Sequence, residues 1–287
     1  MKINKIEPQG FCGGVKRAIN IVNEILSDDK IKEPIYMLGS LIHNKFITDE
    51  FKEKGIIILD DKLTKEQMLE KIDYGTIIIS AHGVAPKIKK IALDKGLNIV
   101  DTTCPYVELI HKNIISAINN KKDVIYIGSK GHPEAIGVLG IDEKINLITS
   151  LGDLKNLKLK STAPYVTNQT TLSIYDIDEF YNEIKEKYPN AIIDNKICMA
   201  TTKRQEAIYN QEKVDLCIIV GDEKSSNTKK LKDAAIKCGI NTILVSSLDE
   251  IKKSSLDFKN LKSISISSGA STPGYLVDEI IDYLKRC

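Results

Sequence analysis

Three of the six cysteines recur at nearly equal intervals along the chain. Cys12, Cys104 and Cys198 are separated by 92 and 94 residues, and each follows a short strand-like segment and precedes a helix-like one. Thiolates that converge on one point suit a soft metal, so zinc and an iron–sulfur cluster are the candidates. None of the three belongs to a C-x-x-C pair. The pattern therefore argues against a local zinc-ribbon site.

The number of thiolates bears on what such a centre would do. A cubane iron–sulfur cluster normally takes four protein thiolates, so one from each of three segments would leave its fourth iron open. An open position is typical of a catalytic metal site, whereas a structural site is closed. The spacing therefore predicts a catalytic centre, and the alternative is a set of loop cysteines that never meet. The remaining cysteines are expected in a strand core, at a helix end and at the exposed C-terminus, as Cys217, Cys238 and Cys287.

Polar loops recur at matching positions in the same three segments. Most of their side chains stand just before a predicted helix, where free backbone N–H groups favour an anion. Each residue alone could equally cap a helix or make a local hydrogen bond, but the recurrence favours a shared pocket. We therefore expect a site for a small phosphorylated molecule, lined by His43, His82, His132, Thr170, Ser225, Ser226, Asn227 and Ser271.

One carboxylate in these loops has no evident structural need. Glu134 could simply favour a helix N-terminus. Beside a metal centre and an anionic substrate, it is instead the natural proton donor, with the pocket histidines serving as cations. His111, seven residues after Cys104 on a predicted helix, is expected at the surface or in a layer behind the site.

The elements that must position these residues also repeat. Three segments of about ninety residues share one order of strands, loops and helices. Strands that read as near-continuous Ile, Leu and Val and alternate with helices indicate parallel sheets covered on both faces. Ligands bind beyond the carboxyl ends of such strands, where the polar loops stand. The predicted fold is α/β, with three pseudo-equivalent units around a central cluster cavity, at residues 1–95, 96–190 and 191–287.

Composition limits the class of protein. The chain has 287 residues, 42% hydrophobic and 28% charged, which is ordinary for a globular enzyme of more than one unit. Its 41 basic and 39 acidic residues give a net charge of +2, so a nucleic-acid partner is not indicated. No apolar run approaches the roughly 20 residues of a membrane span, and no secretory signal is evident. We expect a cytoplasmic protein, where six cysteines indicate metal binding or catalysis rather than disulfides.

Nearly the whole chain, from Phe11 to Ser271, resembles the 4-hydroxy-3-methylbut-2-enyl diphosphate reductases, the last enzymes of the non-mevalonate isoprenoid pathway. The motifs that carry the resemblance are Gly10-Phe11-Cys12-Gly13-Gly14-Val15, Ile42-His43-Asn44, Ala81-His82-Gly83-Val84, Thr103-Cys104-Pro105, Gly131-His132-Pro133-Glu134, Gln169-Thr170-Thr171-Leu172, Cys198-Met199-Ala200-Thr201-Thr202, Ser225-Ser226-Asn227 and Gly269-Ala270-Ser271.

The resemblance implies a three-lobed α/β fold around a [4Fe-4S] cluster and an allylic diphosphate substrate. It implies reductive removal of the substrate's hydroxyl, with isopentenyl and dimethylallyl diphosphate as products and ferredoxin or flavodoxin as electron donor. The three repeated cysteines would hold the cluster, the pocket residues would bind chiefly the diphosphate, Glu134 would supply protons, and Thr170 would hold the hydroxyl end. Gly13 stands where alanine or another residue is common after the first cysteine, and the chain ends at Cys287 without the tail or appended RNA-binding modules of some relatives.

Two other functions fit parts of the pattern. A hydro-lyase would use the same open iron as a Lewis acid without net electron transfer, so redox stoichiometry separates it from a reductase. An iron–sulfur sensor would report oxygen or iron by losing its cluster. A sensor needs an output surface, and the sequence offers no basic helix or recognition motif for one.

Overall fold

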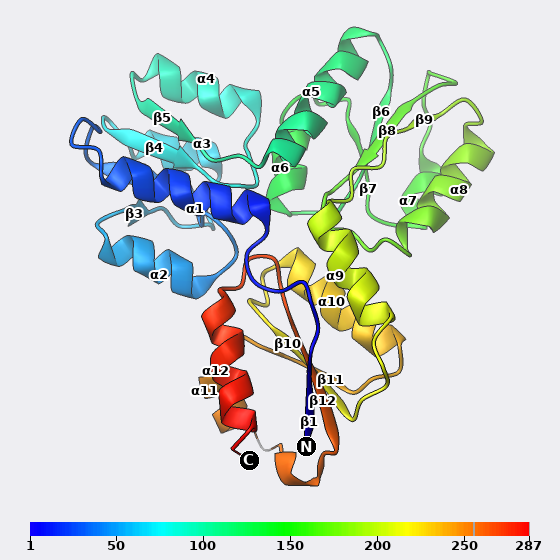
Figure 1. Cartoon of the computed structure of the whole chain (residues 1–287). Helices are drawn as coiled ribbons and strands as arrows, with labels where there is room; N and C mark the ends of the chain where they lie inside the picture. The colour runs from blue at the N-terminus through cyan, green and yellow to red at the C-terminus, as the bar shows by residue number, and fades with distance from the viewer. Residues whose placement is uncertain (255, 287) are drawn as a thin grey trace. The chain divides into compact units, whose positions relative to one another are not determined.

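The computed structural model describes residues 1–254 and 256–286 (Figure 1). Cys287, expected at the exposed C-terminus, lies outside the described residues. The chain divides into two compact units, and each is described by itself. The first unit consists of residues 1–15, 43–45 and 198–287, and the second of residues 16–42 and 46–197.

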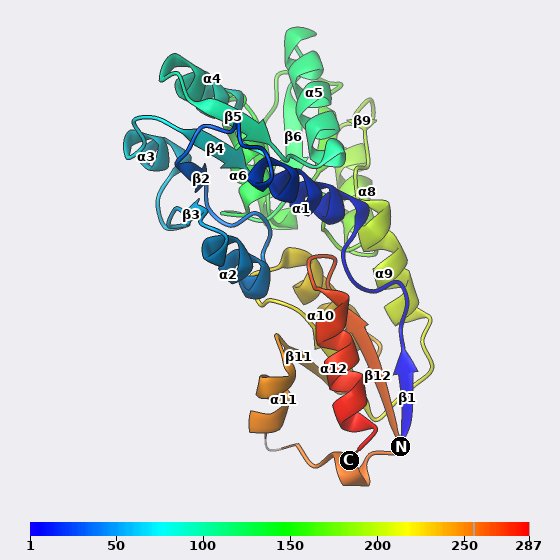
Figure 2. The same ribbon diagram turned by 60° about the vertical axis from the view of Figure 1, so that its left-hand side comes forward.

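The second unit contains two parallel sheets. One has the strand order β3-β2-β4-β5, with strands β2 (Ile35–Met37), β3 (Ile57–Ile58), β4 (Thr76–Ile79) and β5 (Asn98–Asp101). The apolar faces of α3 and α4 pack on one side of this sheet, and Figures 1 and 2 show α1 on the other. The helices of this part are α1 (Gly13–Leu26), α2 (Lys45–Glu53), α3 (Lys65–Glu70) and α4 (Pro86–Asp94). The first residues of α1 and α2, 13–15 and 45, are assigned to the first unit.

The other sheet of this unit has the order β7-β6-β8-β9. Helices α5 and α6 pack on one face around Tyr126, and α7 and α8 pack on the opposite face around Val166. Its strands are β6 (Val124–Ile127), β7 (Asn146–Ile148), β8 (Tyr165–Asn168) and β9 (Ile192–Ile193). Its helices are α5 (Pro105–Asn119), α6 (Pro133–Leu139), α7 (Leu151–Asn156) and α8 (Ile177–Lys187).

The first unit is built on a third parallel sheet, ordered β1-β12-β10-β11. Helices α11 and α12 cover one face, and α9 and α10 cover the other (Figure 2). The strands are β1 (Lys2–Lys5), β10 (Leu216–Val220), β11 (Thr242–Val245) and β12 (Ser263–Ser268). The helical segments are α9 (Met199–Tyr209), α10 (Ser226–Lys237), α11 (Leu248–Lys253), η1 (Phe258–Asn260) and α12 (Gly274–Leu284).

All three sheets of the described chain have four parallel strands, so the predicted α/β class is confirmed. The continuous apolar strands explain this, because β4, β6 and β10 are buried along their whole length and need helices on both faces. Proline at the first helical position begins α4, α5 and α6, where its missing N–H costs nothing.

Strand pairing groups the chain differently from the repeat read along the sequence. Each strand that precedes a repeated cysteine completes the sheet of the segment before it: β5 pairs with β4, and β9 pairs with β8. The N-terminal strand β1 fills the same edge in the last sheet by pairing with β12. By pairing alone, a boundary would fall after Asp101 and not at residue 95. The three-way division stays a prediction.

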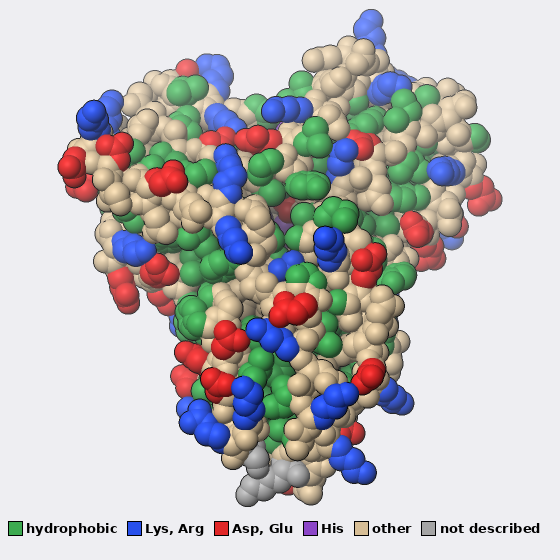
Figure 3. All heavy atoms as spheres, in the orientation of Figure 1, with side chains coloured by type: hydrophobic (Ala, Val, Ile, Leu, Met, Phe, Trp, Pro, Cys, Tyr) green, Lys and Arg blue, Asp and Glu red, His purple; other side chains and the backbone are tan. Residues whose placement is uncertain are grey.

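Two surface properties bear on the partners expected from composition. The face drawn in Figure 3 carries basic and acidic side chains interspersed, in keeping with the balanced totals of 41 and 39. Within residues 1–254 and 256–286, no helix is both long and apolar enough to cross a membrane.

Candidate active site

The three repeated cysteines occupy equivalent local positions. Cys104 and Cys198 are the N-terminal caps of α5 and α9, and Cys12 directly precedes the first residue of α1. All three are half-buried. The Val15 amide lies 3.5 Å from the Cys12 sulfur. Each of the three sulfurs therefore stands at the start of a helix, where free backbone N–H groups carry partial positive charge.

Cys12 and Cys198 belong to one compact unit and Cys104 to the other. Among the described residues there is no preformed group of three His, Cys, Asp or Glu side chains arranged to hold a metal ion. The convergence of the three thiols on one point therefore stays a prediction. The chemistry of the donors fits an iron–sulfur cluster, because they are soft sulfur atoms at three equivalent helix starts.

Two of the cysteines are tied to the loops expected to bind the anion. The Cys104 amide donates to the Ala81 carbonyl at 3.0 Å, next to His82. In the other unit, the Cys12 amide donates to the Ala270 carbonyl at 3.0 Å, next to Ser271. In each unit, therefore, the amide of a candidate cluster-binding cysteine is bonded to the residue just before a candidate substrate-binding residue.

The Cys104 loop is fixed by a half-buried polar cluster that the sequence did not reveal. The Thr103 amide and hydroxyl donate to Asp101, and Lys89 binds the same carboxylate. Burial raises the pKa of Asp101, but these hydrogen bonds outweigh burial and leave its pKa below the ordinary value. Arg17 donates to the Thr103 carbonyl at 3.1 Å. The loop before the cysteine is therefore held from two sides.

In the first unit, the N-terminus of α10 meets the loop after β12. Ser225 caps α10 by accepting from the Thr228 amide at 3.3 Å. A Cβ at Gly269 would stand 2.1 Å from the Thr228 hydroxyl, so only glycine allows this close approach of the two loops. The Ser271 hydroxyl donates to the His43 carbonyl at 3.1 Å, which joins the His43 segment to the same unit. The structure thus gathers Ser225–Asn227, Ser271 and His43 in one unit.

Asn227 is the most telling residue of this group. It stands in the first turn of α10 and is only 4% exposed. Neither its amide oxygen nor its amide nitrogen has a hydrogen-bond partner in the part of the chain described here. A buried amide left unpaired costs free energy, so its presence at a helix start is typical of a binding site that a ligand completes.

The second unit gathers the remaining candidates around α6. The rings of His82 and His132 stand edge to face, with centroids 5.8 Å apart. Glu134 is 4% exposed. The Thr170 amide donates to its Oε2 at 3.0 Å, and the Thr170 hydroxyl donates to its Oε1 at 2.7 Å. Glu134 is thus a buried carboxyl with a fixed orientation in the same unit as both histidines.

Electrostatics in this cluster partly correct the sequence-based expectation. Burial raises the pKa of Glu134, and the two Thr170 hydrogen bonds oppose this shift without cancelling it. Burial also lowers the pKa of His132 to about 4, so the expectation of a cationic His132 is wrong for the ligand-free protein. Its Nδ1 accepts from the Glu134 amide at 3.2 Å. The neutral ring therefore presents an Nε2–H as a hydrogen-bond donor.

Two side chains near this cluster each carry a polar atom without a partner in the described chain. His111 is half-buried, which fits the expected layer behind the site rather than the surface, and its Nε2 has no partner among the residues described. Burial, the Lys89 charge and a weaker opposing effect of Asp101 set its pKa at about 4. Tyr126 is fully buried, and its hydroxyl likewise has no partner within the described chain. Burial and the charge of Glu134 raise its pKa. No spacing signal in the sequence marked Tyr126.

The expectations for two other cysteines are confirmed. Cys217 is fully buried in β10, and Cys238 ends α10.

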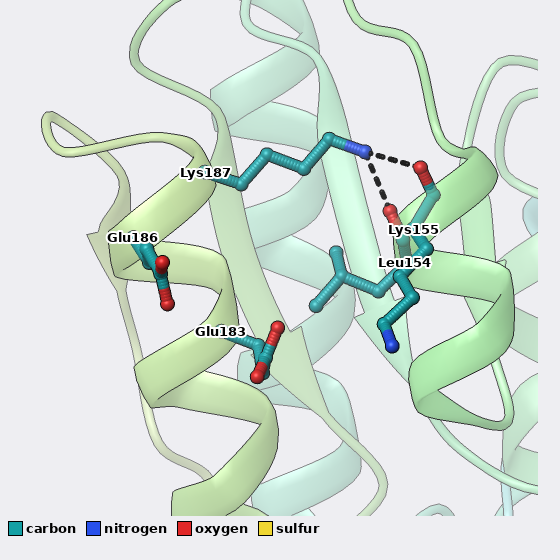
Figure 4. Close-up of a pocket in the computed structure, with 5 residues that line it drawn as sticks. All are labelled: Leu154, Lys155, Glu183, Glu186 and Lys187. Carbon is teal, nitrogen blue, oxygen red and sulfur yellow. Dashed lines mark hydrogen bonds between the residues drawn. The ribbon is translucent and has the colours of Figure 1, made fainter.

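Figure 4 shows a separate surface groove between α7 and α8. Lys187 donates there to the carbonyls of Leu154 and Lys155, at 2.7 and 2.9 Å, and so ties α8 to α7. The five residues that line this groove include none of the candidate site residues.

The chain as a whole matches a known protein family. A family model described as "LytB protein" matches residues 3–285 of the chain. The chain belongs to the LytB family. Curated relatives of this LytB chain include proteins named 4-hydroxy-3-methylbut-2-enyl diphosphate reductase. The Geobacillus thermodenitrificans protein is 42% identical, covering 100% of this chain and 90% of its own. The Bacillus subtilis protein is 40% identical, covering 100% and 91%.

Solved structures agree with the LytB assignment. The reductase from Plasmodium falciparum superposes with a TM-score of 0.89 at 31% identity, covering 98% of this chain and 87% of its own. A second structure is titled as the terminal enzyme of the non-mevalonate pathway. It has a TM-score of 0.70 at 30% identity and covers both chains completely.

Proposed function

We propose that this LytB chain reduces 4-hydroxy-3-methylbut-2-enyl diphosphate to isopentenyl and dimethylallyl diphosphate. Full-length relatives at about 40% identity carry the name of this enzyme. The observation that carries the proposal within the chain is Glu134, a buried carboxyl oriented by Thr170 beside two histidine loops. The same proposal places the enzyme in the cytoplasm, whose reducing conditions keep thiols available.

Cys12, Cys104 and Cys198 would hold a [4Fe-4S] cluster. When bound, the cluster would supply one-electron transfer chemistry, with a ferredoxin or flavodoxin as the proposed source of electrons. The reaction consumes two electrons and two protons: the allylic C–O bond breaks, a C–H bond forms, and the hydroxyl oxygen leaves as water. The protein must therefore bind the diphosphate, aim the hydroxyl and deliver a proton to it.

The diphosphate is bound by donors on several loops. Ser225, Ser226 and Asn227 offer hydroxyl, amide and backbone N–H groups at the start of α10, where negative charge is favoured. His43 and Ser271 belong to the same unit, and His82 and His132 are paired in the other. His132 binds as a neutral donor through Nε2, because its Nδ1 is occupied by the Glu134 amide.

Glu134 gives the proton that leaves with the hydroxyl oxygen. Burial raises its pKa, so the carboxyl holds its proton more readily than an exposed glutamate does. A proton on the departing oxygen makes water the leaving group, which is easier to expel than hydroxide. Thr170 keeps the carboxyl in one orientation. Its proposed second role is to hold the substrate's hydroxyl.

The proposal is tested with Glu134→Gln, assayed anaerobically with an excess of a strong artificial reductant. Glutamine keeps the shape and most hydrogen bonds but lacks the transferable proton. We expect a normal iron content, near-normal substrate affinity and turnover about a hundredfold slower. The control is Glu143→Gln, which removes one carboxylate from an exposed position in the same unit.

Turnover of Glu134→Gln within about tenfold of wild type, a barrier change of about 1.4 kcal/mol, would contradict the role of Glu134. The electron count tests the reaction itself. Wild-type enzyme should consume two electrons for each product molecule. Loss of water from the substrate without consumption of reductant, giving a dehydrated product with one more double bond, would instead establish a hydro-lyase.

A further inference from the structure

A buried arginine links the two cysteine segments of the first unit. Arg204, on α9, is only 3% exposed. One end of its guanidinium donates to the Gly10 carbonyl at 2.7 Å, and the other donates to the Ala200 carbonyl at 2.9 Å. Gly10 stands two residues before Cys12, and Ala200 two residues after Cys198. One side chain therefore joins segments that are almost two hundred residues apart in the sequence.

Among the residues that the structure describes, no buried carboxylate forms an ion pair with Arg204. Both of its hydrogen bonds go to neutral carbonyls, and its buried Nε has no partner within residues 1–254 and 256–286. Cys12 and Cys198 each favour its charged form electrostatically, more than the carboxylate of Glu7 does. Glu7 is 63% exposed, and its nearest cation is Lys5, at 3.8 Å. A buried cation favours nearby negative charge, and as thiolate ligands the two cysteine sulfurs would supply more of it than Glu7 does.

We propose that Arg204 is a positioning residue that clamps the Cys12 loop to the Cys198 helix and places a fixed positive charge beside both sulfurs. This inference rests on the proposed function, in which these sulfurs hold an iron–sulfur cluster. A guanidinium suits both tasks, because it stays charged when buried and its fork of donors reaches two carbonyls at once. A nearby positive charge stabilises the more negative, reduced form of a redox centre. Arg204 thus raises the reduction potential of the site.

The test separates the clamp from the charge. Arg204→Gln removes the charge, and Arg204→Lys keeps the charge but loses the fork. Lys203→Gln is the matched control, because it removes one positive charge from an exposed position on the same helix. Substrate-free protein is reconstituted anaerobically, and its midpoint potential is measured by redox titration with paramagnetic resonance detection. Iron content and the melting temperature of the metal-free chain are measured alongside.

We expect the equilibrium constant for one-electron reduction to fall at least tenfold in Arg204→Gln, a shift of about 59 mV to lower potential. Arg204→Lys should stay within threefold of wild type in that constant but lose iron faster, since one clamp contact is gone. Lys203→Gln should match wild type in both measurements. Loss of the cluster from Arg204→Gln, with retention in Arg204→Lys, would also support the proposal.

A normal potential in Arg204→Gln at full iron content would overturn the inference. So would a large, equal drop in melting temperature of the metal-free chain in both Arg204 variants, because Arg204 would then serve folding in general. Failure of the proposed function looks different. In that case wild-type protein itself would hold no cluster, and the inference would fall with it.

Discussion

Replacing Asn227 by leucine should make the protein more stable and worse at binding. Both polar atoms of this amide are buried and lack a partner in the described chain, at the start of the helix that Ser225 caps. Leucine has the same branching but no polar atoms. The ligand-free protein would therefore no longer bear the free-energy cost of a buried, unpaired amide, and the liganded protein would lose a hydrogen-bond donor to the anion.

The size of the effect follows from two contributions. An unsatisfied buried polar group costs about 1–3 kcal/mol, and each buried methyl group that replaces a polar atom of the amide contributes about 0.8 kcal/mol. Crowding of the larger side chain opposes both by about 1 kcal/mol or more. We expect the free energy of unfolding to rise by about 2 kcal/mol. A lost hydrogen bond to a charged group is worth about 1.5–3 kcal/mol, so diphosphate affinity should fall at least about tenfold.

Urea unfolding followed by circular dichroism gives the stability, and calorimetric titration with inorganic pyrophosphate gives the affinity. Asn227→Ala serves as a second variant that cannot crowd its surroundings. The control is Asn241→Leu, an exposed asparagine of the same unit. Asn227 is a structural residue, and not part of a prebuilt anion site, if both variants are less stable than wild type by more than 1 kcal/mol. The same conclusion follows if both variants bind pyrophosphate as tightly as wild type does.

Two further predictions concern the histidine behind the site and the cysteines. The folded-state pKa of His111 is about 4 against an ordinary 6.5, so the unfolded chain takes up the proton first and stability falls as pH drops below about 6.5. At pH 5 the lower pKa of folded His111 costs about 2 kcal/mol of unfolding free energy, and His111→Leu should remove this loss. Urea unfolding at pH 7.5 and pH 5 measures it. Equal losses of stability in the wild type and in His111→Leu would contradict the prediction. Cys104→Ser should lose iron and turnover, whereas the buried Cys217→Ser should keep both. Iron analysis after anaerobic purification checks this, and the reverse result would refute the ligand assignment.

The periodic features of the sequence were enough to predict the fold class. Near-continuous Ile and Val in β4, β6 and β10 mark buried parallel strands, because such strands are covered on both faces. Cys217 in the core of β10 follows from the same reasoning. The sheet to which an edge strand belongs could not be predicted in this way. β1 pairs with β12 across almost the entire chain, and no local pattern encodes a partner that distant.

The candidate residues were also identified from sequence, because functional side chains at matched loop positions recur three times and chance does not repeat a pattern over ninety residues. The protonation states of these residues could not be predicted from the sequence. His132 is neutral and Glu134 has a raised pKa because of burial, which depends on how neighbouring segments pack.

The sequence by itself determined which residue types stand at the carboxyl ends of the strands, and so the chemistry that the chain can offer. Only the tertiary structure decided which of them are buried, paired or left without a partner. Arg204 reads in the sequence as one more charge on a polar helix. Folding brings its guanidinium to the Gly10 carbonyl, and this contact exists only because β1 and α9 belong to one unit. Burial and long-range pairing are properties of the packed chain, so no reading of spacing alone could supply them.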